Sequence, residues 1–145
     1  MLVRLIMGAS DDRRLLTFTA SALAGTGLVL RATGLPTADI HGPLHYLGVM
    51  DPLCGGTRAA YLLFSGRFGT AALYNPMVFP LFAGIAVLVV RAGFGMATGR
   101  WFDVVLSPQG RRVLAVIMVV GVLALEVRQQ LHAQLLSQPW PPPTR

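Results

Sequence analysis

The sequence predicts an all-α membrane protein with about three transmembrane helices and a short interfacial or re-entrant helical segment between the first and the second. Its 145 residues are 54% hydrophobic and 12% charged, whereas soluble domains carry about 25% charged residues. The mean hydropathy is +0.61. Apolar residues also gather in three long runs, and a helix that crosses a bilayer needs about 20 such residues. Lipid is therefore the expected solvent.

The first part of the chain predicts a short leading segment and the first span. Residues 1–14 mix apolar and charged side chains. We interpret them as a cytoplasmic or interfacial segment and not as a removed signal peptide, because the apolar run that follows is long. The first span is expected at about 15–33. Arg31 lies near its end, from where a long side chain can reach the headgroups.

Segment 34–75 is irregular, because its prolines and glycines interrupt any long helix. A short apolar helix is expected over 57–64, with another turn or two over 68–74. Together these could form an interfacial helix pair or a re-entrant hairpin. Non-helical backbone at membrane depth must be buried in protein or face water, so this segment is expected to need protein contacts.

The second span is expected at about 76–96, with Pro76 in its first helical turn, where the missing N–H costs nothing. Arg91 would face a partner or the headgroups. A polar loop is expected over 99–112.

The third span is expected at about 112–128, which completes a single transmembrane domain over 15–130. The Pro-rich C-terminal tail 131–145 contains Pro141-Pro142-Pro143, which predicts an extended chain.

The net charge is +6, and all 12 basic residues are arginine. These arginines stand singly or in pairs between apolar runs, which excludes a nucleic-acid surface and favours contact with lipid headgroups. Their density is highest in 1–14 and in the loop 99–112. By the positive-inside tendency, the N-terminus is predicted to be cytoplasmic in a multi-pass protein.

One stretch carries a recognisable motif, Asp51-Pro52-Leu53-Cys54-Gly55-Gly56-Thr57-Arg58-Ala59, followed by Ser65-Gly66-Arg67-Phe68 and Tyr74-Asn75-Pro76. It resembles the family catalogued as domain of unknown function 2752, small bacterial membrane proteins with the signature Cys-Pro-x-Cys-Gly-x-Thr-Arg-Ala. The resemblance covers roughly Met50 to Val90. It implies a location in the bacterial cell (inner or plasma) membrane and an architecture, but no activity.

Two departures from the family pattern bear on chemistry. Asp51 stands where the family has its first cysteine, and Arg67 stands where an aspartate is usual. The family's Cys-x-x-Cys invites a metal or redox interpretation, but this chain keeps only Cys54. Redox cycling within the chain is therefore excluded.

The motif residues make sense as a structural element. Pro52 and Gly55-Gly56 predict a tight turn, and the Thr57 hydroxyl can cap the helix that follows. Arg58 is unfavourable in a first helical turn, so Asp51 is its expected partner. Asn75 can cap the second span. The candidate structural or binding residues are Asp51, Pro52, Cys54, Gly55, Thr57, Arg58, Arg67, Asn75 and Pro76.

The sequence does not predict a catalytic or metal site. Cys54 could join His41, His45 and Asp51 around a metal, but the histidines lack a recognised ligand spacing. Cys54 as a nucleophile would have only His45 as a nearby base. Glu126, near Arg128, could relay protons, but at a helix end it is more often an interfacial charge. We expect no enzyme activity, no catalytic residue, no metal and no cofactor.

Two functions remain open. The first is a small accessory or structural subunit that docks on a larger bacterial membrane complex and stabilises or assembles it, with other integral membrane subunits as partners. The alternative is a module that binds or transports a lipid or small ligand through the re-entrant segment 51–76, where Arg58 and Arg67 would meet anionic groups.

Overall fold

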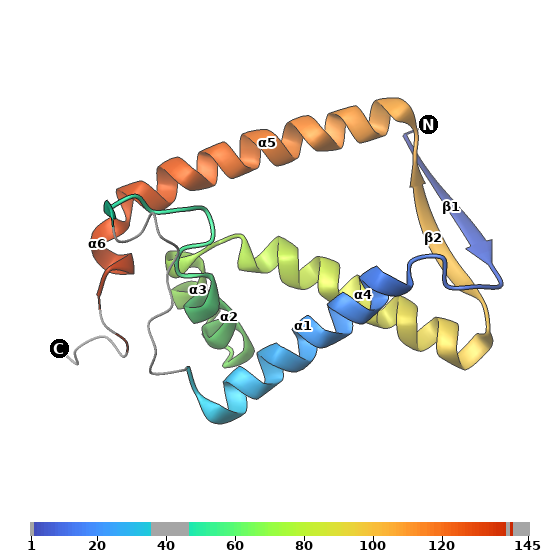
Figure 1. The fold of residues 1–145 in the computed structure, drawn as a ribbon, viewed down its shortest axis with the longest axis horizontal. Coiled ribbons are helices and arrows are strands. Elements are labelled where there is room, and N and C mark those ends of the chain that lie inside the picture. The colour runs from blue at the N-terminus through green and yellow to red at the C-terminus, as the bar shows by residue number, and fades with distance from the viewer. Residues whose placement is uncertain (1, 36–46, 139, 141–145) are drawn as a thin grey trace.

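The computed structural model describes residues 2–35, 47–138 and 140, and it is mostly helical with one small sheet (Figure 1). In chain order, the elements are β1 (Val3–Gly8), α1 (Arg14–Thr33), α2 (Gly56–Phe64), α3 (Phe68–Tyr74), α4 (Val78–Thr98), β2 (Trp101–Leu106), α5 (Pro108–Leu131) and α6 (Ala133–Leu136).

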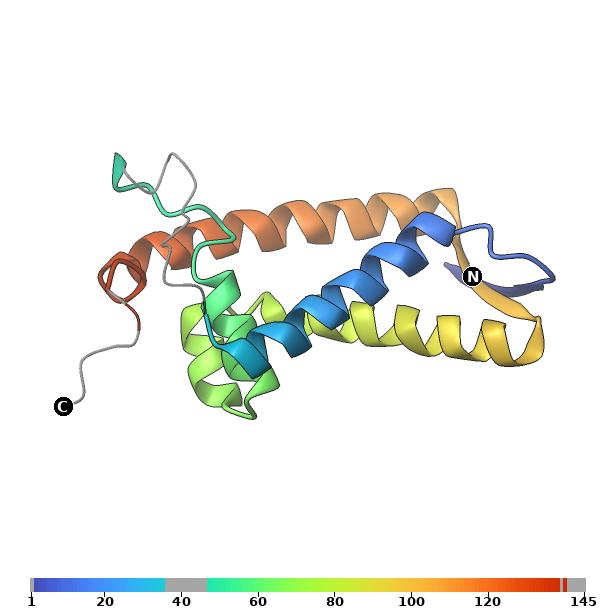
Figure 2. The same cartoon turned by 60° about the horizontal axis from the view of Figure 1, so that its bottom comes forward.

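Three long helices connect two dissimilar ends of the molecule. The sheet lies at one end, and the short helices α2, α3 and α6 lie at the other (Figures 1 and 2). Helices α1, α4 and α5 have 20, 21 and 24 residues. At about 1.5 Å per residue, each is at least about 30 Å long, which matches the thickness of a bilayer's hydrocarbon core.

Helices α1 and α4 are long and apolar enough to cross a membrane, and they lie close to the first two predicted spans. Within the most apolar stretch of each, only 11% and 22% of the residues are buried inside the chain. A core helix of a soluble protein would be mostly covered by its own chain. The two helices therefore point to a membrane protein.

The third predicted span also falls within a helix, because α5 contains the whole of 112–128. This helix begins after Ser107, whose side-chain oxygen accepts the Gly110 N–H at 3.0 Å, and Pro108 occupies its first turn. Two helices, α1 and α4, qualify as membrane spans by length and composition in the described part of the chain. The predicted number of three is therefore not confirmed.

The all-α prediction is wrong, because β1 and β2 form a two-stranded antiparallel sheet. Its register runs from Val3 opposite Leu106 to Gly8 opposite Trp101. The predicted leading segment 1–14 thus contains β1, and the predicted polar loop 99–112 contains β2. Each strand alone is short, and an isolated pair of strands is barely stable. The pair joins the segment before α1 to the segment after α4, and these helices are linked near it, because Arg91 of α4 donates to the Thr17 hydroxyl of α1 at 3.1 Å.

The predicted short helices are confirmed as α2 and α3, with the break at 65–67. They hold the hydrophobic core, which lies at the end opposite the sheet. Its buried members are Met50, Cys54, Ala59, Leu62, Leu63, Ala71, Tyr74, Val78 and Leu136. Leu136 comes from α6, so the tail predicted to begin at residue 131 starts with helical structure. Pro141-Pro142-Pro143 lies outside the described residues.

The strand register makes a testable prediction. In a Cys54→Ala background, Leu5→Cys combined with Val104→Cys should form a disulfide on mild oxidation, because Leu5 and Val104 are direct cross-strand partners and such pairs lie within disulfide reach. A protease site introduced between the two cysteines allows the measurement, because after cleavage only a disulfide keeps the two fragments together on a non-reducing gel. The matched control is Leu5→Cys with Val105→Cys, whose side chains leave opposite faces of the sheet. Equal crosslinking in both pairs would contradict the register.

Candidate functional site

The motif residues 51–56 fold into a tight turn held by their own backbone. The Cys54 N–H donates to the Asp51 carbonyl at 3.0 Å, and the Gly56 N–H donates to the Leu53 carbonyl at 2.8 Å. The Asp51 carboxylate accepts the Leu53 N–H at 2.7 Å. Asp51 thus shapes the turn at the position where the family signature has a cysteine.

Gly55 is required in this turn for two reasons. Its φ of +73° lies in the left-handed region, which glycine adopts without steric cost. A Cβ at this position would also lie 2.7 Å from a Leu136 methyl group and 3.1 Å from the Tyr74 carbonyl oxygen. The turn therefore packs directly against the end of α3 and against α6.

Asn75 ties the turn to the beginning of α4. Its side-chain amide donates to the carbonyls of Pro52 at 2.9 Å and Cys54 at 3.1 Å. Its side-chain oxygen accepts the Met77 N–H at 3.0 Å. This last bond closes a turn that includes Pro76, but α4 begins at Val78 after Met77 without a side-chain cap, so the prediction that Asn75 caps the second span is wrong. Asn75 is 2% exposed, so these bonds replace water.

The C-terminal end of α5 also forms hydrogen bonds with this turn and with the residues just before it. Gln129 is completely buried, and its side-chain amide donates to the carbonyl oxygens of Cys54 and Tyr74. Gln130 accepts the Met50 N–H at 2.9 Å and donates to the Gly48 carbonyl at 3.1 Å. Sequence reasoning missed both residues. The available signal was two adjacent amides shortly after the apolar run that ends at Leu125.

Arg128 completes this contact by holding the end of α3. Its guanidinium donates to the Ala72 carbonyl at 2.9 Å, to the Leu73 carbonyl at 3.1 Å and to the Gln129 side-chain oxygen at 2.8 Å. A cation at a helix C-terminus is favourable, because the last carbonyls there lack helical partners. We call the set Asn75, Arg128, Gln129 and Gln130 the motif clamp.

Two further details of the predicted motif are wrong. Arg58, 7% exposed, donates to the Leu136 carbonyl at 3.1 Å and lies 5.9 Å from the Tyr74 ring centroid. The ion pairs among described residues do not include one between Arg58 and Asp51. Helix α2 begins at Gly56 after Gly55, without a side-chain cap, so Thr57 does not cap it.

The predicted anion site of Arg58 and Arg67 is not assembled either. Arg58 is buried in the first turn of α2, whereas Arg67 is exposed beyond its last turn. Six residues of rise, about 9 Å, separate Arg58 from Phe64 at the end of α2, and Arg67 follows after the turn. The two arginines therefore serve different surroundings.

Cys54 is buried, 5% exposed. Burial raises the pKa of its thiol, and the neighbouring Asp51 carboxylate raises this pKa further. A protonated thiol is a poor nucleophile and a poor metal ligand. Among the described residues, no three His, Cys, Asp or Glu side chains gather to hold a metal. His41 and His45 lie outside the described residues, so their predicted proximity to Cys54 is not addressed.

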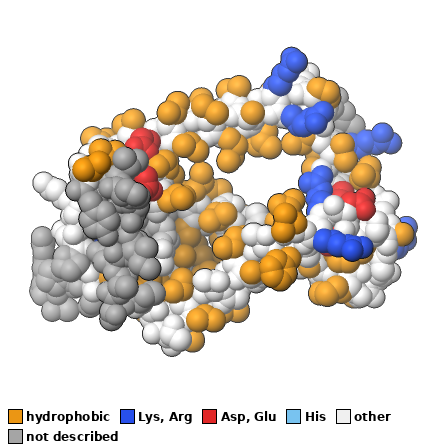
Figure 3. All heavy atoms as spheres, in the orientation of Figure 1, with side chains coloured by type: hydrophobic (Ala, Val, Ile, Leu, Met, Phe, Trp, Pro, Cys, Tyr) orange, Lys and Arg blue, Asp and Glu red, His pale blue; other side chains and the backbone are white. Residues whose placement is uncertain are grey.

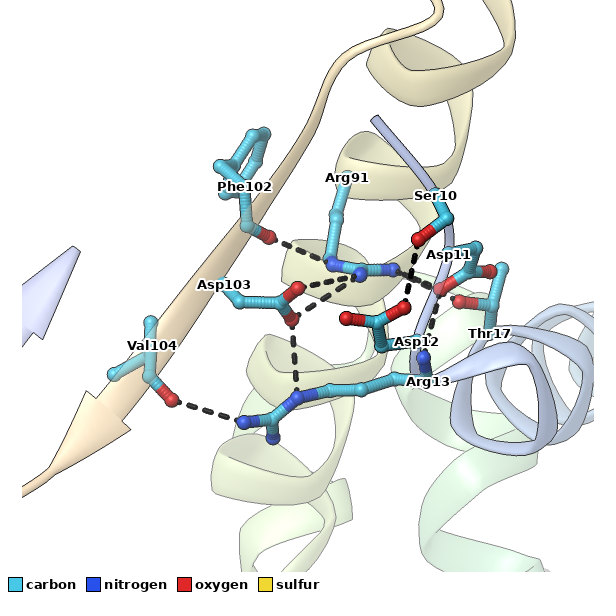
Figure 4. Close-up of polar contacts among 9 residues, drawn as sticks. All are labelled: Ser10, Asp11, Asp12, Arg13, Thr17, Arg91, Phe102, Asp103 and Val104. Atoms are coloured by element: carbon cyan, nitrogen blue, oxygen red, sulfur yellow. Dashed lines mark hydrogen bonds and ion pairs between the residues drawn. The ribbon is translucent and has the colours of Figure 1, made fainter. Parts of the chain in front are cut away.

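A second polar cluster, which the sequence analysis did not predict, lies at the sheet end (Figure 4). Its centre is Arg91 of α4, which is 3% exposed. The guanidinium donates to Asp11 at 2.9 Å, to Asp103 at 3.1 and 3.2 Å, and to the Phe102 carbonyl at 2.8 Å. Arg91 therefore faces acids of its own chain, where a partner or the headgroups had been expected.

Neighbouring residues complete this cluster, which we call the sheet-end network. Arg13 bridges to Asp103 at 3.0 Å and donates to the Val104 carbonyl at 3.0 Å. The Trp101 ring lies 5.1 Å from the Arg91 guanidinium, and any side chain at Gly95 would collide with that ring. The network joins β2, α4 and the segment before α1, so it fixes how the sheet sits on the helices.

The charges of this network lower the pKa of Asp11. Partial burial alone would raise the pKa of this carboxyl, but hydrogen bonds from Arg91, the Arg13 N–H and Thr17, with the Arg91 charge, lower it below 3.8. Throughout the described part of the chain, every buried side-chain nitrogen or oxygen has a partner. Both clusters are thus satisfied internally, which is the arrangement expected of structural elements.

A comparison with known families finds a match to the segment that contains the motif. Residues 43–89 match the family model described as a protein of unknown function, DUF2752. The chain resembles that family over this segment, as its motif predicted. The DUF2752 segment includes the turn, α2, α3 and the first half of α4. Comparisons with curated proteins and with solved structures gave no match.

The clamp thus joins residues from inside and outside the DUF2752 segment. Asn75 lies within it, but Arg128, Gln129 and Gln130 belong to α5, beyond its end. Asn75 and Gln129 donate hydrogen bonds to the carbonyls of a buried turn, and the clamp thereby holds α5 by its C-terminal end.

The clamp predicts a specific loss of stability. Gln129→Ala should lower the free energy of unfolding by about 2 kcal/mol or more, because it leaves the buried Cys54 and Tyr74 carbonyls with fewer donors and an unsatisfied buried group costs about 1–3 kcal/mol. Thermal unfolding in detergent measures the change. Gln134→Ala, at an exposed position of α6, is the matched control and should change stability by less than about 0.5 kcal/mol. Equal effects would rule out the clamp.

The sheet-end network predicts a pH dependence. The lowered pKa of Asp11 contributes stability that is present above 3.8 and is lost as the pH falls through the folded-state value. Wild type should therefore melt above Asp11→Asn at neutral pH, and the difference should shrink on acidification below 3.8. Melting curves over this range test it. Asp12→Asn, beside it but outside the Arg91 contacts, is the control. A difference between wild type and Asp11→Asn that stays constant with pH would oppose this assignment.

Proposed function

We propose that this chain is a small integral membrane accessory subunit that docks on a larger membrane complex and stabilises or assembles it, with α5 as its docking element. The observation that carries the proposal is the exposure of α5. Every residue from 111 to 124 is exposed, and this stretch is almost entirely apolar after Arg112. Val116, Ile117 and Val120 are each about 60% exposed.

Helix α5 is fixed at its two ends and bare between them. At its start, the Ser107 N–H donates to the Leu2 carbonyl at 3.1 Å, and at its finish the motif clamp holds Gln129. Figure 3 shows an opening through the molecule between α5 and the helices below it, with hydrophobic side chains along its edge. The chain thus positions an apolar helix without covering it, which favours a covering partner.

The side chains of α5 suit contact with another helix. Many are β-branched valine or isoleucine, whose few rotamers leave little conformational entropy to lose on docking. Gly121 offers a point of close approach, because a Cβ there would meet nothing within 4 Å. Helices in lipid associate through such small residues and tight van der Waals packing. These features favour a partner's transmembrane helix over disordered lipid tails.

The charge distribution supports three membrane crossings with a cytoplasmic N-terminus. The sheet end carries exposed arginines at Arg4, Arg14, Arg100, Arg111 and Arg112. Under the positive-inside tendency that end faces the cytoplasm. Helix α5, about 36 Å long, then crosses outward with Arg111 and Arg112 at one interface and Arg128 near the other. The DUF2752 resemblance favours the bacterial cell membrane as the location.

In this proposal the DUF2752 turn has a mechanical role. The motif clamp holds the C-terminal end of α5 against α3 and the turn at 51–56, while the sheet-end network fixes the helices at the opposite end. The partner would then meet an α5 whose direction is already set, which reduces the ordering cost of association.

Site-specific crosslinking tests the proposal. A photo-crosslinking residue at Val120 in α5 should capture another integral membrane protein in intact cells, and native mass analysis after mild extraction should find the chain bound to larger subunits. Val90 in α4, an exposed valine of similar accessibility, is the matched control and should capture mainly lipid.

Two results would count against the proposal. One is lipid adducts alone at Val120. The other is recovery of the chain only as a monomer after extraction that preserves other membrane complexes. Protein adducts of equal yield at both positions would show that α5 is not the preferred docking element.

A further inference from the structure

A pocket of about 290 Å³ lies between α1, α2 and α4. Its walls include Leu23 and Leu30 of α1, Ala60 and Phe64 of α2, and Leu81 and Ile85 of α4. Its volume is at the lower end of the range for small-molecule sites, which are lined mainly by apolar side chains. It is separate from the bare face of α5 used above.

The pocket is apolar nearly throughout. Of its two threonines, Thr26 donates its hydroxyl to the Ala22 carbonyl at 2.9 Å, within its own helix. That hydroxyl is therefore already satisfied and does not call for a polar ligand. Phe64 and Phe82 form part of the wall as an edge-to-face pair with centroids 5.4 Å apart, which gives the pocket a defined shape.

The pocket lies in one half of the length of helices α1 and α4. The lining of α1 comes from its second half, and the lining of α4 comes from its first half. Both are the helices long and apolar enough to span a membrane. In a bilayer spanned by α1 and α4, the pocket lies in the half of the hydrocarbon layer nearer the motif clamp, where the apolar ligands at hand are acyl chains.

Positive charge lies at the same end. Arg31 directly follows the wall residue Leu30, and Arg67 comes three residues after Phe64. Both side chains are exposed. The last turn of α1 lies beside the turn that joins α2 to α3 (Figures 1 and 2). Two arginines beside the opening of an apolar pocket complement a ligand with an anionic head and an apolar tail.

We propose that this pocket binds one acyl chain of an anionic phospholipid, with the phosphate held by Arg31 and Arg67. The apolar walls account for the chain, and the two arginines account for the headgroup. A zwitterionic lipid offers the same acyl chain but adds a cation near the arginines, so it binds more weakly. This differs from an anion site at Arg58, because that side chain is buried and donates to Leu136.

Lipid titration of the delipidated full chain in nonionic detergent tests the proposal by native mass analysis. Dimyristoyl phosphatidylglycerol should bind at one copy per chain and more tightly than dimyristoyl phosphatidylcholine. Glycerol phosphate, which lacks acyl chains, should not bind detectably. Replacing both arginines in Arg31→Gln/Arg67→Gln should weaken binding of the anionic lipid about thirtyfold, at roughly fivefold for each charge. The matched control Arg111→Gln/Arg112→Gln removes two charges at the other end of the molecule and should leave it unchanged.

Filling the pocket tests the acyl-chain half of the proposal. Thr26→Phe should abolish one-to-one binding of both lipids, whereas Thr19→Phe, two turns earlier on the same helix and outside the lining, should not. Leu81→Trp fills the pocket from α4 and serves if the first variant does not accumulate. Equal affinity for the two lipids, or undiminished binding in both filled variants, would overturn the proposal. So would capture of a protein helix in this pocket by a crosslinker at Leu81.

Discussion

The structure depends most on one buried acceptor, the carbonyl oxygen of Cys54. It accepts side-chain amide hydrogens from both Asn75 and Gln129, and a carbonyl has two lone pairs to offer. These two bonds join the motif turn, the start of α4 and the end of α5. Because the donors are neutral amides, the junction avoids the desolvation cost of buried charges. Because Asn75 and Gln129 lie outside the turn, the turn depends on other parts of the chain to satisfy this carbonyl.

The opposite end of the molecule solves a similar problem with charge. Arg91 is nearly as buried as Asn75 and Gln129, but it is held by two carboxylates, a carbonyl and an indole ring. A buried cation is tolerable only when it is paired and its hydrogens are used. The cluster lies near the sheet and the arginine-rich end of the helices, where water and headgroups come close in the proposed orientation. Neutral amides and an ion network thus fix the two ends independently.

These two anchors leave a helix and a pocket with different surroundings. Helix α5 extends between the anchors with exposed aliphatic side chains, whereas the pocket is a partly open hollow lined by α1, α2 and α4, with exposed Arg31 and Arg67 at the same end. A long exposed helix face favours a protein helix, and an apolar hollow near positive charge favours a lipid. Docking and lipid binding are therefore separable properties: variants at Val120 address the first and variants at Thr26 address the second.

The helices and the motif segment can be predicted from local sequence. Long apolar runs place α1 and α4, and the glycines around α2 and α3 break the chain locally, so these elements follow from nearby residues. The strand pairing and the two buried clusters depend on tertiary contacts. The two strands that pair lie near opposite ends of the sequence, at 3–8 and 101–106. Arg91 bonds to Asp11 across a sequence separation of 80 residues. Gln129 reaches Cys54 across 75. Such partners leave no periodic pattern in the sequence, because each contact depends on where whole helices bring their ends together.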